Sequence, residues 1–183
     1  MAMTNMKKLT VVCALGAVGL AQAQAYLEGS YLYGANKATS SVGTTESTGG
    51  LAAGIVGYQF HPNISVEGML ATGLTNDDIK LNGATQRTPV TQKGDVSAGA
   101  FVRAKAALRD SVEVFARLGR VEWRATSTAG TASASSNLTD WVYGLGLNYK
   151  LTKSMYLSGS VMSLYNKDNI KADGWSIGIG YKF

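Results

Sequence analysis

Large apolar or aromatic side chains alternate with small or polar ones along several stretches of the chain. The clearest stretch is Trp141–Leu151, where every odd-numbered residue is large and apolar and most residues between are glycine or polar. Trp175–Phe183 repeats the pattern at the C-terminal end. A period of two residues is that of a β-strand, whose successive side chains point to opposite faces. The pattern therefore predicts strands with one apolar face and one small or polar face.

Weaker forms of the same alternation extend over the rest of the chain. Two phenylalanines, Phe101 and Phe115, fall on the small or polar face, and a change of phase after Leu118 predicts a β-bulge near Gly119. The eight predicted strands are Tyr26–Gly34, Leu51–Phe60, Ile64–Leu70, Val96–Ala106, Val112–Leu118, Trp141–Leu151, Met155–Tyr165 and Trp175–Phe183.

Short and long connections alternate between these strands. The short ones are His61–Asn63, Leu108–Ser111 and Thr152–Ser154. The long ones are Ala35–Gly49, Thr75–Gly94 and Thr126–Asn137, and Asn166–Asp173 is intermediate. Two stretches, Lys37–Thr48 and Thr126–Asn137, are nearly all serine, threonine, glycine and alanine and are expected to stay mobile and hydrated. The alternation of short and long connections is typical of an up-and-down barrel in an outer membrane, with short periplasmic turns and longer outer loops. The fold class predicted is therefore all-β, an eight-stranded antiparallel transmembrane β-barrel.

Aromatic residues gather at both ends of the predicted strands, as expected where rings lie at two membrane interfaces. Those beside the short turns are Tyr58, Phe60, Tyr149, Tyr181 and Phe183, and those beside the long links are Tyr33, Trp123, Trp141, Tyr143, Tyr165 and Trp175. The rival is a soluble sandwich or lipocalin-like barrel in the periplasm, with its apolar face inside. That arrangement is disfavoured because it leaves an outer surface made mostly of glycine, serine and alanine.

The N-terminal segment has the features of a signal peptide. Lys7 and Lys8 precede an apolar run, Leu9–Leu20, and small residues follow it. We expect cleavage after Ala25, with Ala23 as the alternative, which gives a signal peptide at residues 1–25 and a barrel domain at residues 26–183.

Cysteine usage and charge exclude several kinds of protein. The single cysteine, Cys13, lies within the apolar run, so the mature chain has neither a disulfide framework nor a cysteine-ligated zinc site. The net charge is +5, but no cluster of lysine and arginine stands out, so nucleic acid is not expected as a partner.

Three segments, taken in order, resemble a known family. They are the hairpin from Gly50 to Glu67, the stretch Tyr143–Leu151 and the end Gly178–Phe183. The chain resembles the small eight-stranded outer-membrane barrels of bacteria, the porin-like β-barrel family with opacity-protein-like and outer-membrane-protein-A-like domains. The resemblance implies location in the bacterial outer membrane, help from periplasmic chaperones and the outer-membrane insertion machinery, and Phe183 as the C-terminal aromatic residue of the assembly signal.

Eight ionisable side chains are expected to face the barrel interior, which in an eight-stranded barrel is just wide enough for its own side chains. Charges in so narrow a space must pair or meet water. Expected pairs are Lys105 with Glu113, Glu67 with Arg103 or Arg117, and Glu28 with Lys182. The complete set, predicted as a structural polar network, is Glu28, Glu67, Arg103, Lys105, Glu113, Arg117, Lys150 and Lys182.

The outer side offers candidates for contact with other molecules. Arg120 and Arg124 are expected near the phosphates of lipopolysaccharide. A host or phage ligand is expected, if anywhere, at Thr75–Gly94, which contains Ile79, Leu81, Arg87 and Val90. Outer-membrane lipids are the remaining expected partners.

No catalytic residue, cofactor or metal site is expected. The one histidine, His61, lies in a predicted periplasmic turn, far from the outer rim where the resemblance implies that lipid A enzymes of this fold keep theirs. Loop carboxylates at Asp77, Asp78, Asp140 and Asp168 are expected to be solvated. We therefore expect a non-enzymatic outer-membrane protein with a polar, plugged interior and an envelope-structural or surface-contact role. A narrow pore for ions or small solutes is the alternative, and a lipid A-modifying enzyme is the disfavoured third.

Overall fold

A computed structural model describes residues 24–40, 43–78, 80–81, 84–85, 90–129, 132–167 and 169–183. Residues 1–23, and with them almost the whole predicted signal peptide, lie outside the described residues. Within the described part, no helix is long and apolar enough to cross a membrane.

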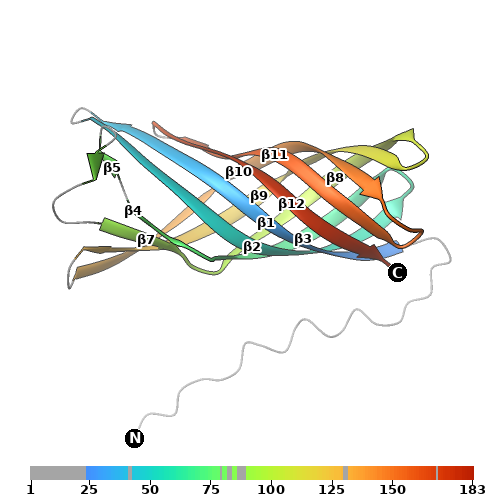
Figure 1. The fold of residues 1–183 in the computed structure, drawn as a ribbon, viewed down its shortest axis with the longest axis horizontal. Coiled ribbons are helices and arrows are strands. Elements are labelled where there is room, and N and C mark those ends of the chain that lie inside the picture. The colour runs from blue at the N-terminus through green and yellow to red at the C-terminus, as the bar shows by residue number, and fades with distance from the viewer. Residues whose placement is uncertain are drawn as a thin grey trace, which may run out of the picture.

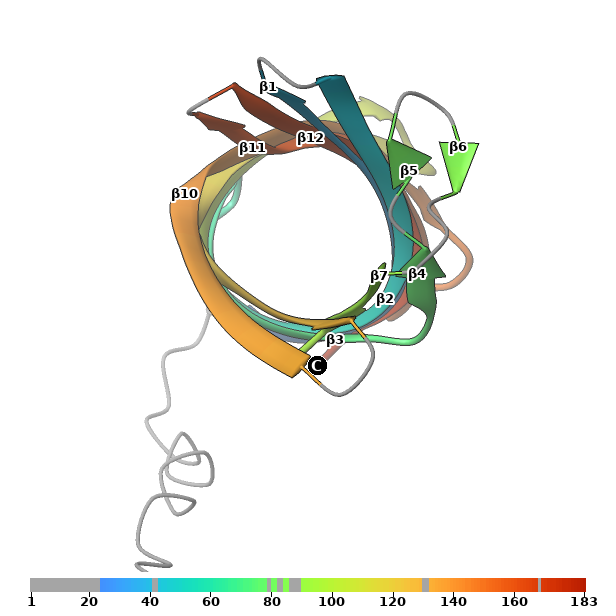
Figure 2. The ribbon, with the colours of Figure 1, turned by 90° about the vertical axis from the view of Figure 1, so that its left-hand side faces the viewer.

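Eight long antiparallel strands form a closed ring, which confirms the predicted fold class (Figures 1 and 2). Strand β1 pairs with both β2 and β12, so the first and last strands close the barrel. The long strands are β1 (Gln24–Ser40), β2 (Gly43–His61), β3 (Ile64–Gly73), β8 (Ser97–Arg109), β9 (Val112–Ala129), β10 (Ala132–Lys150), β11 (Met155–Lys167) and β12 (Ile170–Lys182). Four short strands lie between β3 and β8: β4 (Asn76–Asp78), β5 (Lys80–Leu81), β6 (Ala84–Thr85) and β7 (Val90–Gly94).

The two ends of the barrel differ (Figure 1). One end, which we call the turn end, carries the tight connections at 62–63, 110–111 and 151–154 together with the C-terminus. The other, the hairpin end, carries long strand pairs that continue past the girdle aromatics. The predicted alternation of short and long connections is thus present.

The outer links contain much more strand than expected. The β1–β2 ladder continues to the pair Ser40 and Gly43, and the β9–β10 ladder continues to Ala129 and Ala132. The expectation that Lys37–Thr48 and Thr126–Asn137 lack regular structure was therefore wrong for most of these residues. Serine and threonine offer little apolar surface, but a hairpin is held by backbone hydrogen bonds, which any non-proline residue supplies.

The outward face of the barrel is the apolar one, as predicted. On β10, for example, Trp141, Tyr143, Leu145, Leu147 and Tyr149 are all more than half exposed. The girdle residues Tyr58, Phe60, Trp175, Tyr181 and Phe183 are also exposed outward, and Tyr33 stacks on Trp175 with ring centroids 5.7 Å apart.

Two expected girdle residues and one expected bulge are corrected. Strand β9 continues without a register shift through Gly119, so Val121 is buried at 1 % exposure and Trp123 points inward, where its indole N–H donates to the Leu164 carbonyl at 3.1 Å. A register shift in β11, between Ser163 and Tyr165, turns Tyr165 inward. Strict alternation assigns a side chain to a face only where the strand is regular, so it assigned Tyr165 to the wrong face.

Candidate functional site

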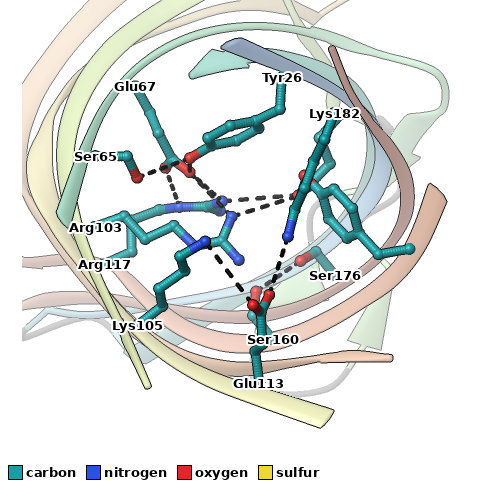
Figure 3. A network of polar contacts seen from close by, with 12 residues as sticks. Tyr26, Ser65, Glu67, Arg103, Lys105, Glu113, Arg117, Ser160, Ser176 and Lys182 are labelled. Carbon is teal, nitrogen blue, oxygen red and sulfur yellow. Dashed lines mark hydrogen bonds and ion pairs between the residues drawn. The ribbon is translucent and has the colours of Figure 1, made fainter. Parts of the chain in front are cut away.

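Four charged side chains meet in the middle of the lumen (Figure 3). We call Glu28, Glu67, Arg103 and Arg117 the central cluster; they come from β1, β3, β8 and β9, and their side chains are between 0 and 3 % exposed. Two carboxylates face two guanidinium groups, so the cluster is neutral as a whole. Because isolated burial of such charges costs several kcal/mol, this pairing is the condition for placing them in the lumen.

Glu67 is the most tightly bound member of the cluster. Its Oε1 accepts hydrogen bonds from the Tyr26 hydroxyl at 2.5 Å and from Arg103 Nη1 and Arg117 Nη2, both at 3.2 Å. Its Oε2 forms an ion pair with Nε of Arg117. The Tyr26 hydroxyl also contacts Ser65 Oγ at 3.0 Å. The pairing of Glu67 with Arg103 or Arg117 was predicted, and the structure places it against both.

Glu28 is held more loosely. Its carboxylate oxygens lie 3.7 Å from Arg103 Nη1 and 3.8 Å from Arg117 Nη2, and the Tyr156 hydroxyl donates to Oε2 at 3.1 Å. The expected pair with Lys182 does not form in the described structure. The register is the reason, because Tyr26 is opposite Lys182 and Glu28 lies one inward-facing position further along β1, opposite Gly180.

Aromatic rings fill the space between the charges. The guanidinium carbon of Arg103 lies 3.8 Å from the centroid of the Phe115 ring, and Tyr26 packs edge-on against Tyr156. Arg103 Nε and Nη2 make no hydrogen bond to another described protein group, and the guanidinium group stacks on Phe115 and lies 5.7 Å from the centroid of the Tyr26 ring. Phe101 and Phe115, the two exceptions to the sequence pattern, are thus inward-facing residues that occupy the lumen.

A second group of charges lies closer to the turn end. We call Lys105, Glu113, Lys150 and Lys182 the lysine cluster; the Glu113 carboxylate lies 3.2 Å from Lys182 Nζ, 3.5 Å from Lys150 Nζ and 3.9 Å from Lys105 Nζ. Neutral oxygen acceptors also bind two of these three lysines. Lys105 donates to Gln59 Oε1 at 2.7 Å, and Lys150 donates to the Asp110 carbonyl at 3.2 Å. The structure thus places the eight ionisable residues predicted for the interior in two separate clusters.

The lumen towards the hairpin end is apolar, which the sequence reasoning missed. We call this region the apolar layer; it consists of Leu32, Ala53, Ile55, Met69, Ala71, Phe101, Val121, Val142, Leu164, Tyr165 and Ala172. The expectation of a polar interior is therefore correct only for the middle and the turn end. Inward positions of β1 provided a signal, since Leu32 follows Tyr26 and Glu28 at even numbers, on the same face.

The remaining sequence candidates lie away from the lumen clusters. Exposed His61, in the turn at 61–63, accepts a hydrogen bond from the Asn63 amide at 3.3 Å. Arg120 and Arg124 are exposed, and Arg124 pairs with Glu122 at 2.8 Å. Phe183 is 73 % exposed, and its amide donates to the Ala25 carbonyl at 2.9 Å.

The outer-side acidic residues and contact candidates are described only in part. Asp140 accepts backbone hydrogen bonds from Trp141 and Asn166, which lower the pKa of its carboxyl group, the bond from Asn166 having the larger effect. Asp168, Ile79 and Arg87 lie outside the described residues, as do the side chains of Asp77, Asp78, Leu81 and Val90. In the described part of the chain, no three histidine, cysteine or acidic residues are grouped as a metal site.

Comparison with known proteins identifies the family of this chain. Residues 10–183 match the family model of the outer membrane protein beta-barrel domain. The chain belongs to this family. It is accordingly an outer-membrane β-barrel protein, with the turn end on the periplasmic side and the hairpin end outside. No curated protein sequence matches the chain.

Solved structures share the fold at low sequence identity. Ail, the attachment invasion locus protein of Yersinia pestis, solved with the heparin analogue sucrose octasulfate, has a TM-score of 0.61 at 18 % identity, over 88 % of this chain and 99 % of Ail. Neisserial surface protein A has a TM-score of 0.63 at 14 % identity, over 87 % of this chain and 97 % of its own. OprG from Pseudomonas aeruginosa has a TM-score of 0.57 at 15 % identity, over 87 % and 95 % respectively.

Proposed function

We propose that this protein is a non-enzymatic barrel with a plugged lumen, serving envelope structure or contact at the cell surface. The observation that carries the proposal is the central cluster, whose four charged side chains are at most 3 % exposed and pack among Tyr26, Tyr156 and Phe115. An eight-stranded barrel has little interior space beyond that of its own side chains. A path for ions would have to displace these groups and break their pairs.

Single-channel conductance in a planar bilayer tests the plug. Wild-type protein is expected to show no stable conductance, and Glu67→Gln and Arg117→Gln are expected to open transient events because each leaves a charge unpaired. If the wild type conducts and these substitutions alter its conductance, the narrow pore becomes the function. Lys37→Gln, at an exposed position in the β1–β2 hairpin, is the matched control and is expected to behave as wild type.

Surface contact is assigned to the hairpin end. The β1–β2 and β9–β10 hairpins continue past the girdle aromatics, and Ail, which shares the fold, was solved with a heparin analogue. Replacing residues 126–135 by a two-residue turn is expected to lower adhesion of a non-adherent bacterium that displays the barrel to cultured epithelial cells. Adhesion no greater than that of the vector control, with the intact barrel displayed, would contradict the contact role and leave the structural one.

Arg120 and Arg124 are proposed to bind lipopolysaccharide phosphates from the outward face. Both side chains are exposed, although Glu122 already neutralises part of the charge on Arg124. Changing both arginines to glutamine is expected to lower the amount of lipopolysaccharide that stays bound during purification. Unchanged binding would show that these residues are ordinary solvated charges.

Secretion is proposed to remove residues 1–23, the alternative cleavage, so that Gln24 is the first residue. The support lies in β1, where Gln24 and Ala25 pair with Gln59 and Tyr58, and the Ala25 carbonyl accepts the hydrogen bond from the Phe183 amide. Cleavage after Ala25 would remove that acceptor. The intact mass of the purified mature protein distinguishes the two sites.

Phe183 is proposed as the assembly signal read by the insertion machinery, after delivery by periplasmic chaperones. The exposed ring at the end of β12 is accessible to such a reader. Phe183→Ser is expected to lower the fraction of chain that reaches the outer membrane and shows a mobility shift on boiling. Tyr149→Ser, an exposed aromatic at the same end, is the control.

A further inference from the structure

The hairpin end contains a cavity of about 290 Å³ above the apolar layer. Its walls are formed by side chains from five of the long strands, β2, β9, β10, β11 and β12: Leu51, Trp123, Leu138, Leu164, Tyr165 and Ile170. We call this cavity the cup. Figure 2, which looks into the barrel from this end, shows the ring of strands that surrounds it.

The floor of the cup is closed by packed side chains. Leu164, Tyr165 and Ala172 line the cup and also belong to the apolar layer, together with Leu32 and Phe101. The central cluster lies beyond that layer. A molecule that enters from outside therefore meets a closed apolar floor, and the cup acts as a binding site with one entrance.

Most polar residues that line the cup come from the two long hairpins, and Thr75 and Ser97 add two further hydroxyl groups. The hairpin residues are Asn36, Thr45, Ser47 and Ser136, and Asn36 donates to Ser47 at 3.5 Å. Among the described residues that line the cup, Arg124 is the one charged residue; its side chain is exposed, and its guanidinium group binds Glu122. The site therefore has an apolar body, a neutral polar rim and no unpaired charge.

We propose that the cup binds a small uncharged molecule with an aromatic or aliphatic body and one hydroxyl-like polar group. Apolar concavities with a few polar groups are the usual form of small-molecule sites, and barrel mouths are a common place for them. The volume is about twice that of an engineered apolar cavity of roughly 150 Å³ that binds benzene, so a bicyclic ring fits the size. A charged ligand is disfavoured because no unpaired partner meets it there.

The test uses 2-naphthol, which is uncharged at neutral pH, and the folded barrel in lipid nanodiscs. Isothermal titration, with the heat of empty nanodiscs subtracted, is expected to show saturable binding with one molecule per barrel. Naphthalene-2-sulfonate has the same ring system with a fixed negative charge, and it is expected not to bind. If the sulfonate binds as well as 2-naphthol, the assignment to an uncharged ligand is overturned.

Two variants on the wall and rim locate the site. Leu138→Asp places a charge on the wall, and Ser136→Phe fills space at an exposed rim position; each is expected to weaken binding by about tenfold or more. Thr139→Asp adds the same charge on the next residue, which strand alternation places on the outer face, and is expected to bind 2-naphthol like the wild type.

The readout separates the cup from the lipid and from unfolding. The mobility shift on boiling must persist in each variant, which shows that the barrel is folded. Absence of saturable heat with the wild type, or equal binding by Leu138→Asp and Thr139→Asp, overturns the proposal, because 2-naphthol then dissolves in the bilayer or binds elsewhere on the barrel.

Discussion

The lumen contains two layers that fill similar space with different chemistry. In the middle, Glu28, Glu67, Arg103 and Arg117 are held by directional ion pairs and hydrogen bonds. Towards the hairpin end, aliphatic and aromatic side chains of the apolar layer fill the same ring of strands by contact alone. A buried charge is stable only beside a group of opposite charge or a hydrogen-bond partner, whereas apolar side chains need only to fill the available volume. The middle layer is therefore suited to closing the barrel, and the outer layer to lining a site for an apolar molecule.

Removing Glu67 is the most severe way to disturb the central cluster. Glu67→Ala leaves two buried guanidinium groups without their main carboxylate, so the free energy of unfolding is expected to fall by about 4 kcal/mol. Urea unfolding in micelles, followed by tryptophan fluorescence, measures the change. A loss below about 1 kcal/mol would mean that water enters the lumen and solvates the arginines, which would weaken the contrast between the layers.

A cavity made in the apolar layer is expected to lower the free energy of unfolding slightly less than the loss of Glu67. Ile55 is 2 % exposed, and Ile55→Ala removes buried apolar volume, with an expected loss of about 3 kcal/mol. The same unfolding measurement applies. The neighbouring Val56 is 54 % exposed on the outer face, and Val56→Ala is the control, expected to cost well below half as much. Equal losses would show that the apolar layer is loosely packed.

Substitution of a glycine beside the central cluster tests whether the side chains there are closely packed. A Cβ atom at Gly57 would clash with Cζ of the Tyr26 ring, so Gly57→Ala must displace the tyrosine that donates to Glu67, at an expected cost of about 2 kcal/mol. Gly54, on the same strand, has open space around its Cβ position, and Gly54→Ala is the matched control with little expected change. If both substitutions behave alike, Tyr26 is free to move and the plug is soft.

The exposed ion pair between Lys37 and Glu46 is expected to have the smallest effect. Both side chains are about half exposed or more and lie 2.9 Å apart in the β1–β2 hairpin, so Lys37→Ala is expected to change stability by less than about 1 kcal/mol. Comparison with Glu67→Ala gives the difference in stabilisation between a buried and a solvent-exposed ion pair in the same protein. A large loss at Lys37 would indicate that the hairpin contributes to closing the barrel.

The sequence by itself determined the strand number, the outward apolar face and the set of inward charges. Each of these depends on alternation along one strand, such as Trp141–Leu151, and on the lengths of the links between strands. The two clusters are a different matter. Glu28 lies one inward-facing position away from the place that would bring it to Lys182, and only the register of β1 against β12 decides this.

Tertiary structure alone decided the apolar layer, the cup and the extent of the hairpins. Trp123 and Tyr165 are aromatic residues near strand ends, as girdle residues are. Trp123 faces inward because β9 continues without a register shift, and Tyr165 faces inward because of the register shift in β11. The serine- and threonine-rich links form strands because a partner strand satisfies their backbone groups, a condition that is not visible in either segment alone. Alternation determines which side chains share a face of one strand. Register and bulges determine which inward-facing side chains of different strands lie at the same level along the barrel axis. That alignment places the charged residues together in one part of the lumen and the apolar residues together in another.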